Sequence, residues 1–200
     1  MTAEPFIRRA RAEDRQALSD ICLKTADSGN DASALYSDPD YPGLVWAVPY
    51  LEFSPDFCFV VDVEGTAMGY IVGTPDTAAF ETRLDAEWWP GLRRRYAERV
   101  VEKPLDGNVL SYITAPQYLP RDIARHYPAH LHINLLRPLQ SGGWGRRLIA
   151  TELEALTAAG APGVHLGVSR TNENAQGFYS NIGLTRQDRA DGLWFVKALG

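Results

Sequence analysis

Cysteine, long apolar runs and surplus positive charge are all scarce in this 200-residue sequence. Cys22 falls on an apolar helical stripe and Cys58 lies in the strand-like segment DFCFVV. We therefore expect two small buried hydrophobic residues rather than a disulfide or a catalytic thiol. No run reaches the roughly 18 apolar residues of a membrane span, and the opening MTAEPFIRRA lacks the apolar core of a secretory signal. These absences predict a cytoplasmic protein.

The charge balance argues against a nucleic-acid partner. The formal net charge is -5, whereas phosphate binding needs a surplus of Lys and Arg on one face. The one basic run, Arg93 to Arg95, is followed by Glu98 and is interpreted as a solvated helix face. With 45% hydrophobic residues, the chain can bury the core of one domain over residues 1–200, or of two closely packed halves.

Hydrophobic periodicity predicts a mixture of strands and helices in the first half of the chain. Residues 57–74 read as a hairpin around Glu64-Gly65, because β-branched and aromatic residues flank a turn. A helix through residues 78–100 must be interrupted or kinked at Pro90. The other expected elements are a strand at 6–10, a helix from about 12 to 25, loop and short helix over 37–56, and a short helix at 120–127.

The second half predicts the order β-α-β-α-β-β. The expected elements are a strand at 131–136, a helix at 143–159, a strand at 163–169, a helix at 172–183, and strands at 184–189 and 193–199. Gly160 and Gly183 end the two helices. A strand-helix-strand unit implies that part of the sheet is parallel.

The segment QSGGWGRR, residues 140–147, places three glycines and two arginines between a strand and a helix. The first N–H groups of a helix have no intrahelical partner, so glycines there would expose a backbone cradle for a diphosphate. Arg146 and Arg147 stand where the helix dipole disfavours cations, which indicates an anionic ligand. A turn that only lets the strand and helix pack closely remains the alternative. The P-loop Lys is missing, and Leu148 replaces the third glycine of a dinucleotide fingerprint.

Two motifs resemble those of the GCN5-related N-acetyltransferase (GNAT) superfamily. The first is Gln140-x-x-Gly143-x-Gly145, and the second is Asn172-x-x-Ala175-x-x-Phe178-Tyr179-x-x-x-Gly183-Leu184. The segments SPDFCFVVDVEGTAMGYIVGTPDT and YPAHLHINLL also resemble the acetyltransferase-like C-terminal domain of O-GlcNAcases and its free-standing bacterial relatives. The resemblance implies an α/β (α+β) GNAT fold, a mixed sheet of six to seven strands that is splayed at the cofactor site and flanked by helices.

The resemblance also implies acetyl-coenzyme A as cofactor and a division of the chain at about residue 128. Residues 1–128 would carry the substrate-side helices and the hairpin, and residues 129–200 would bind the cofactor. Asn172 would contact pantetheine, cap its helix, or do both. The implied cofactor-binding residues are Asn134, Leu135, Arg137, Gln140, Ser141, Gly142, Gly143, Trp144, Gly145, Arg146, Asn172, Ala175, Phe178 and Tyr179.

In such enzymes an amine attacks the thioester directly, and Tyr179 is the candidate proton donor to the leaving thiolate; core packing of Tyr179 is the alternative. For the base, Asp76 is the first candidate, followed by His132 and His130. A metal site at His126, His130 and His132 is not expected, since no carboxylate or cysteine completes it. The acceptor surface is expected to use acidic and aromatic residues of the first half: Asp27, Asp31, Tyr41, Trp46, Tyr112 and Tyr118.

Three functions stay open at this point. The first is an acetyltransferase acting on the amine of an unidentified small-molecule or protein acceptor. The second is a non-catalytic acyl-CoA-binding or protein-interaction module, because a diphosphate cradle and a catalytic base are separate requirements. The third, a domain that assembles with a glycosidase, rests on family analogy alone. The sequence leaves the acceptor and the oligomeric state undetermined.

Overall fold

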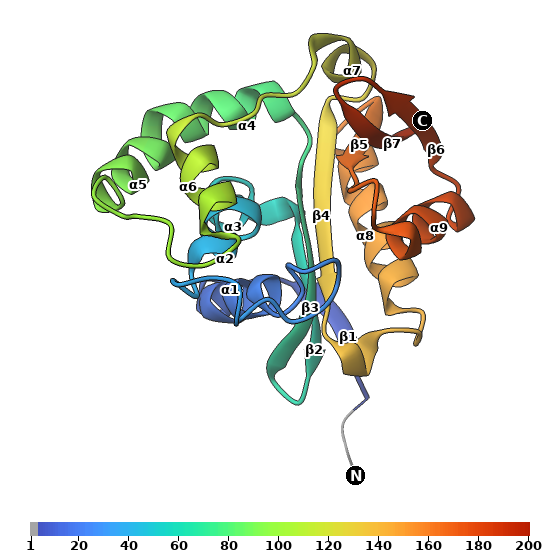
Figure 1. The fold of residues 1–200 in the computed structure, drawn as a ribbon. Coiled ribbons are helices and arrows are strands. Elements are labelled where there is room, and N and C mark those ends of the chain that lie inside the picture. The colour runs from blue at the N-terminus through green and yellow to red at the C-terminus, as the bar shows by residue number, and fades with distance from the viewer. Residues whose placement is uncertain (1–3) are drawn as a thin grey trace.

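Seven strands form one mixed sheet in the computed structural model, which describes residues 4–200 (Figure 1). The spatial order is β1-β2-β3-β4-β5-β7-β6, and only the β4–β5 pair is parallel. The strands are β1 (Phe6–Arg9), β2 (Cys58–Val63), β3 (Thr66–Thr74), β4 (Ala129–Leu135), β5 (Gly163–Gly167), β6 (Thr185–Arg189) and β7 (Gly192–Ala198). The mixed sheet expected from the sequence is confirmed.

Helices cover both faces of this sheet, as Figure 1 shows. One face carries α1 (Arg15–Leu23), α2 (Tyr41–Trp46), α3 (Val48–Phe53), α4 (Thr77–Arg83), α5 (Trp89–Arg95) and α6 (Asp106–Thr114). The other face carries α8 (Trp144–Ala158) and α9 (Glu173–Asn181), while α7 (Arg121–His126) lies at one end. Strand alternation divides the apolar residues between two cores: Tyr70 and Val72 join the first, and Ile71 joins the second.

The segment between β3 and β4 departs most from the sequence prediction. The expected helix over 78–100 is divided into α4, a π-helical turn at Leu84–Trp88, and α5. Pro90 occupies the first turn of α5, where its missing N–H costs nothing. Helix α6 was not predicted. It has a weak amphipathic pattern and includes Gly107 and Asn108, which are poor helix formers.

Most other expected elements are confirmed. The hairpin turns at Glu64 and Gly65, whose φ angles of 52° and 85° are those of a turn that suits twisted strands. The helix expected from residue 12 begins with a 3-10 turn, Ala12–Asp14, before α1. Cys22 and Cys58 are both free and buried, as predicted.

Within residues 4–200 no helix is long and apolar enough to cross a membrane. One domain over residues 1–200 stays a prediction, and its first three residues lie outside the described range.

Strands β4 and β5 pair over only two positions, Ala129 with Val164 and His130 with His165. Beyond His130, β4 continues along β3 as far as Leu135, whereas β5 ends at Gly167 and pairs with β7. The sheet therefore opens between its two parallel strands. This opening leads toward the turn between β4 and α8.

Candidate active site

The backbone of β4 offers unpaired groups to this opening. The N–H of Leu136 donates to the Met68 carbonyl at 3.0 Å. This bond determines which backbone groups of β4 point toward β3. Since antiparallel bonding alternates along a strand, Asn134 faces β3, and Ile133 and Leu135 face the other way. Ile133 was not among the predicted site residues. The Asn134 side chain also points into the fold, donating to the Tyr70 hydroxyl at 2.6 Å.

The turn after β4 exposes the beginning of α8. Arg137–Leu139 forms a 3-10 turn, and the Gln140 side chain donates to the Leu135 carbonyl at 2.9 Å, closing the turn on the strand. Gly143 caps α8 with φ of 79°, a left-handed conformation that favours glycine. A Cβ at Gly143 would meet no atom within 4 Å, so the space immediately beside it is open.

The first turn of α8 leaves N–H groups free. The first backbone bond into the helix runs from Arg147 N–H to the Gly143 carbonyl at 3.2 Å, so the N–H groups of Trp144, Gly145 and Arg146 have no intrahelical partner. No acidic residue lies in this turn. The Arg147 guanidinium lies 4.6 Å from the centre of the Trp144 ring, while Arg146 is exposed. Ser141 and Gly142, also exposed, complete the turn, so the geometry is that of an anion cradle.

Helix α9 packs close to this turn because Gly145 has no side chain. A Cβ on Gly145 would lie 3.1 Å from the Phe178 ring. The packing interpretation of the glycine turn therefore holds at Gly145, and the cradle interpretation fits Gly143. Asn172 caps α9, its Oδ1 accepting from the Ala175 N–H at 3.0 Å.

Tyr179 is buried against Phe195 and Phe178, with ring centroids 5.6 and 5.3 Å away. Its hydroxyl has no hydrogen-bond partner among residues 4–200. Burial raises the pKa of Tyr179 to about 12. The hydroxyl therefore keeps its proton throughout the physiological pH range.

Three histidines gather where β4 and β5 separate. The His130 ring lies 5.5 Å from that of His165 and 5.9 Å from that of His132. His165 is buried, and its Nδ1 lies 2.7 Å from the Tyr127 carbonyl. Burial lowers the pKa of His132 and of His165 to about 4 and that of His130 well below its usual value. All three imidazoles are therefore neutral at physiological pH.

The candidate bases occupy different surroundings. The His132 ring packs 5.4 Å from the Tyr50 ring and forms no hydrogen bond within residues 4–200. Asp76 caps α4 and is exposed, its Oδ1 accepting from the Ala79 N–H at 3.0 Å. His126 lies apart on α7, where it is exposed. In the described part of the chain, no three His, Cys, Asp or Glu side chains converge as a metal site.

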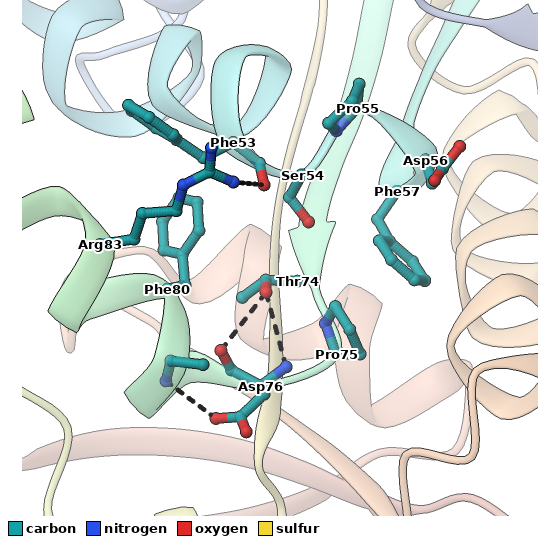
Figure 2. A pocket seen from close by; sticks show the side chains of 11 residues that line it. Phe53, Ser54, Pro55, Asp56, Phe57, Thr74, Pro75, Asp76, Phe80 and Arg83 are labelled. Atoms are coloured by element: carbon teal, nitrogen blue, oxygen red, sulfur yellow. Dashed lines mark hydrogen bonds between the residues drawn. The ribbon is translucent and has the colours of Figure 1, made fainter. Parts of the chain in front are cut away.

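Asp76 also borders a cavity of about 310 Å³ at the end of β3 (Figure 2). Figure 2 shows the Arg83 guanidinium beside the Phe53 ring, and Thr74 above Asp76. Phe80 forms part of the same wall and stacks on Tyr50 with ring centroids 4.6 Å apart. The cavity thus adjoins the aromatic side chains that pack around His130, at the opposite end of β4 from the anion cradle.

The predicted acceptor residues do not form one surface. Tyr41 is fully buried in the core, so its assignment to an acceptor surface is wrong. Tyr118 is exposed and donates to Asp85 at 2.7 Å, and Tyr112 packs 6.3 Å from Trp46. The predicted Asp27 and Asp31 lie on the exposed loop after α1.

Sequence reasoning missed several side chains of the site: Tyr50, Thr77, Glu152 and His165. Tyr50 and Thr77 bond to His130, from which they are 80 and 53 residues distant in the sequence. Glu152 is fully buried with no partner for either carboxylate oxygen in the described chain. Of these four residues, only His165 could have been noticed from the sequence, because it is a polar residue within the apolar strand segment GVHLGV.

A sheet with one parallel pair that opens toward an exposed helix N-terminus defines the N-acetyltransferase fold, and known proteins agree. No protein-family model matches the chain. The crystal structure of SsHAT is 34% identical, with a TM-score of 0.91 over 99% of this chain and 100% of that one. The yncA structure from Salmonella typhimurium, with its cofactor acetyl-CoA, superposes with a TM-score of 0.57 at 13% identity, covering 98% and 94% of the two chains.

Among curated proteins, the O-GlcNAcases of Rattus norvegicus and Mus musculus are 24% identical over 190 residues, which is 94% of this chain. The chain spans about a fifth of the length of these relatives, 21%. The chain belongs to the GCN5-related N-acetyltransferase superfamily, and it resembles the C-terminal region of the O-GlcNAcases.

Proposed function

We propose that the chain is an acetyl-CoA-dependent N-acetyltransferase that transfers the acetyl group to an amine. The observation that carries this proposal is the continuity between the opening of β4 from β5 and the unpaired amides at the start of α8. A packing turn alone would not need a helix start without a side-chain cap bond at Gly143, where the space is open.

The residues present fit acetyl-CoA. The N–H groups of Trp144, Gly145 and Arg146, with the Arg146 guanidinium, would hold the diphosphate. The backbone of Ile133 and the N–H of Leu135 would pair with the pantetheine amides, since the Leu135 carbonyl already accepts from Gln140, and Phe178 and Ala175 would line the far side. The yncA structure, which has the same fold, contains acetyl-CoA. When bound, acetyl-CoA supplies the thioester from which the acetyl group is taken.

The reaction needs two proton transfers while the C–N bond forms and the C–S bond breaks: one from the amine and one to the leaving sulfur. Tyr179 holds a proton for the sulfur that leaves, since burial keeps its hydroxyl protonated. His132 is placed to take a proton from the amine, because its ring has no other partner and lies just past the last β4–β5 pair. Asp76, the first candidate from the sequence, becomes the second for this role, because it is exposed at the cavity near the other end of β4.

The acceptor is proposed only as an amine, on a small molecule or a protein, and the site is proposed to work in the cytoplasm. The free, buried thiols of Cys22 and Cys58 are consistent with a reducing compartment. The uncharged histidine cluster would favour an amine that has lost its proton, since burial disfavours charge.

Release of free CoA thiol in the presence of a panel of amines tests this function. We expect acceptor-dependent release by the wild type, and a decrease of kcat of about 10²-fold or more in Tyr179→Phe, with acetyl-CoA binding retained. Tyr36→Phe, another buried tyrosine, is the control and should not change the rate. Binding of acetyl-CoA without release by any amine would instead support a non-catalytic binding module.

A further inference from the structure

A chain of hydrogen bonds crosses the fold from α3 to the connection between α7 and β4. The Tyr50 hydroxyl lies 2.5 Å from His130 Nε2, and Thr77 Oγ1 lies 2.7 Å from His130 Nδ1. Thr77 Oγ1 also lies 2.6 Å from the Pro128 carbonyl oxygen. Tyr50 and Thr77 are buried, with 5% and 3% of their surfaces exposed, so water does not compete for these bonds.

The direction of every proton in this chain follows from its last member. The Pro128 carbonyl can only accept, so the single hydroxyl proton of Thr77 must point to it. Thr77 Oγ1 is then an acceptor toward the ring, so His130 must carry its proton on Nδ1. Nε2 is left with a lone pair and accepts from the Tyr50 hydroxyl. The backbone thus selects one tautomer of His130.

With these bond directions both ring nitrogens of His130 are occupied, so the ring does not take a second proton. A proton on Nε2 would oppose the Tyr50 hydroxyl proton, which has no other acceptor among residues 4–200. His132, two residues further along the same face, has no such bonds and packs on the edge of the Tyr50 ring. The hydrogen bonds therefore occupy both ring nitrogens of His130, whereas the His132 ring forms no hydrogen bond within residues 4–200.

We infer that Tyr50 and Thr77 are positioning residues of the reaction, which lock His130 as a neutral Nδ1–H imidazole so that His132, and not His130, is available to the amine. This inference rests on the proposed acetyltransferase function. It adds that Tyr50 also fixes the His132 ring, since the Tyr50 ring contacts both imidazoles with centroids 5.3 and 5.4 Å away. Displacing the base lowers the rate of acetyl transfer and does not weaken cofactor binding.

Nitrogen NMR of histidine-labelled protein reads the tautomer directly, and only four histidines need to be assigned. We expect His130 to be protonated on Nδ1 in the wild type and in Thr77→Ser, which keeps the hydroxyl. In Thr77→Val the Nδ1 proton loses its acceptor, so the Nδ1–H form should no longer be selected and the Nε2–H form should be detected beside it. Thr82→Val is the matched control, because Thr82 lies on the same helix and its hydroxyl bonds only to the Ala78 carbonyl.

The kinetic expectation separates positioning from binding. In Thr77→Val and Tyr50→Phe, kcat should decrease on the order of tenfold while KM for acetyl-CoA changes less than about twofold. Thr77→Ser should restore kcat. A wild-type His130 protonated on Nε2, or an unchanged kcat once the tautomer has moved, would overturn the inference. If His130 is protonated on Nδ1 but the protein acetylates no amine, the chain of hydrogen bonds is upheld. The role of Tyr50 and Thr77 in the reaction and the proposed function are then both overturned.

Discussion

Glu152 is the least expected side chain of the molecule. It lies on the inner side of α8, fully buried, and neither carboxylate oxygen has a partner among residues 4–200. Gly73 of β3 makes room for it, because a Cβ there would overlap Glu152 Oε1. Burial raises the pKa of Glu152 to about 8, and Arg9 offsets this only in part. The carboxyl is thus mainly protonated at neutral pH.

A pH-dependent stability follows from Glu152. Its ordinary pKa of 4.5 applies to the unfolded chain and about 8 to the folded one. Between these values the folded chain holds the extra proton, so its contribution to stability is complete below pH 4.5 and is lost as pH rises to about 8. The expected loss is about 1.4 kcal/mol per pH unit within that window.

Denaturant unfolding of Glu152→Gln across pH 5 to about 9 measures this effect. We expect the variant to lose less stability than the wild type as pH rises, and to be the more stable of the two at pH 8 to about 9. Glu154→Gln, an exposed position on the same helix, should follow the wild type. Parallel curves for the wild type and Glu152→Gln would show that Glu152 ionises normally.

At the scale of single residues, the sequence predicted those that lie in local motifs and missed those paired over long distances. Asn172 is a helix cap, as one of its two predicted roles required. Tyr50 and Thr77 reach His130, a predicted candidate base, only through tertiary packing of α3, α4 and β4, and nothing local marks these two residues. Tyr41 was misplaced because aromatic residues in a proline-rich segment give no sign of which will be buried.

Among the elements, α9 depends on two small contacts at the site. Asn172 satisfies an N–H of its first turn, and Phe178 packs on Gly145 of α8. Because Tyr179 is carried by this helix, its placement depends on the same contacts.

Asn172→Ala should therefore lower the free energy of unfolding by about 1 kcal/mol, the usual cost of losing a cap. Thermal or denaturant unfolding checks this value. Asn174→Ala, two residues further along and exposed, is the control and should change stability by less than about 0.5 kcal/mol. Equal effects of the two substitutions would indicate that the Asn172 side chain does not cap α9 in solution.

Strong periodicity predicted elements better than composition did. The hairpin β2–β3 and helix α8 have clear apolar patterns and were placed within a few residues. The helices between Thr77 and Thr114 were predicted less well. The π-helical turn at Leu84–Trp88 shifts the register of the first of them, and α6 begins with weak helix formers. Tertiary packing against α2 and α5 compensates for those residues.

For the whole molecule, the opening of the sheet follows from unequal strand lengths. Strand β4 is paired with β3 over six positions, whereas its pairing with β5 stops after two. The sequence motifs predicted the turn and both helices at this opening, since glycine spacing is local. They predicted Leu135 there but named Asn134 in place of Ile133, because the register that turns Ile133 toward the opening depends on the partner strand.

The central claim is that acetyl-CoA binds at the start of α8, and calorimetric titration with acetyl-CoA tests it most directly. Gly143→Trp fills the open space beside the cradle, and Gly160→Trp is matched, because Gly160 lies at the other end of α8 with the same φ of 79° and open surroundings. We predict binding by the wild type and by Gly160→Trp, and its loss in Gly143→Trp. Equal binding by both variants, or none by the wild type, would contradict the account.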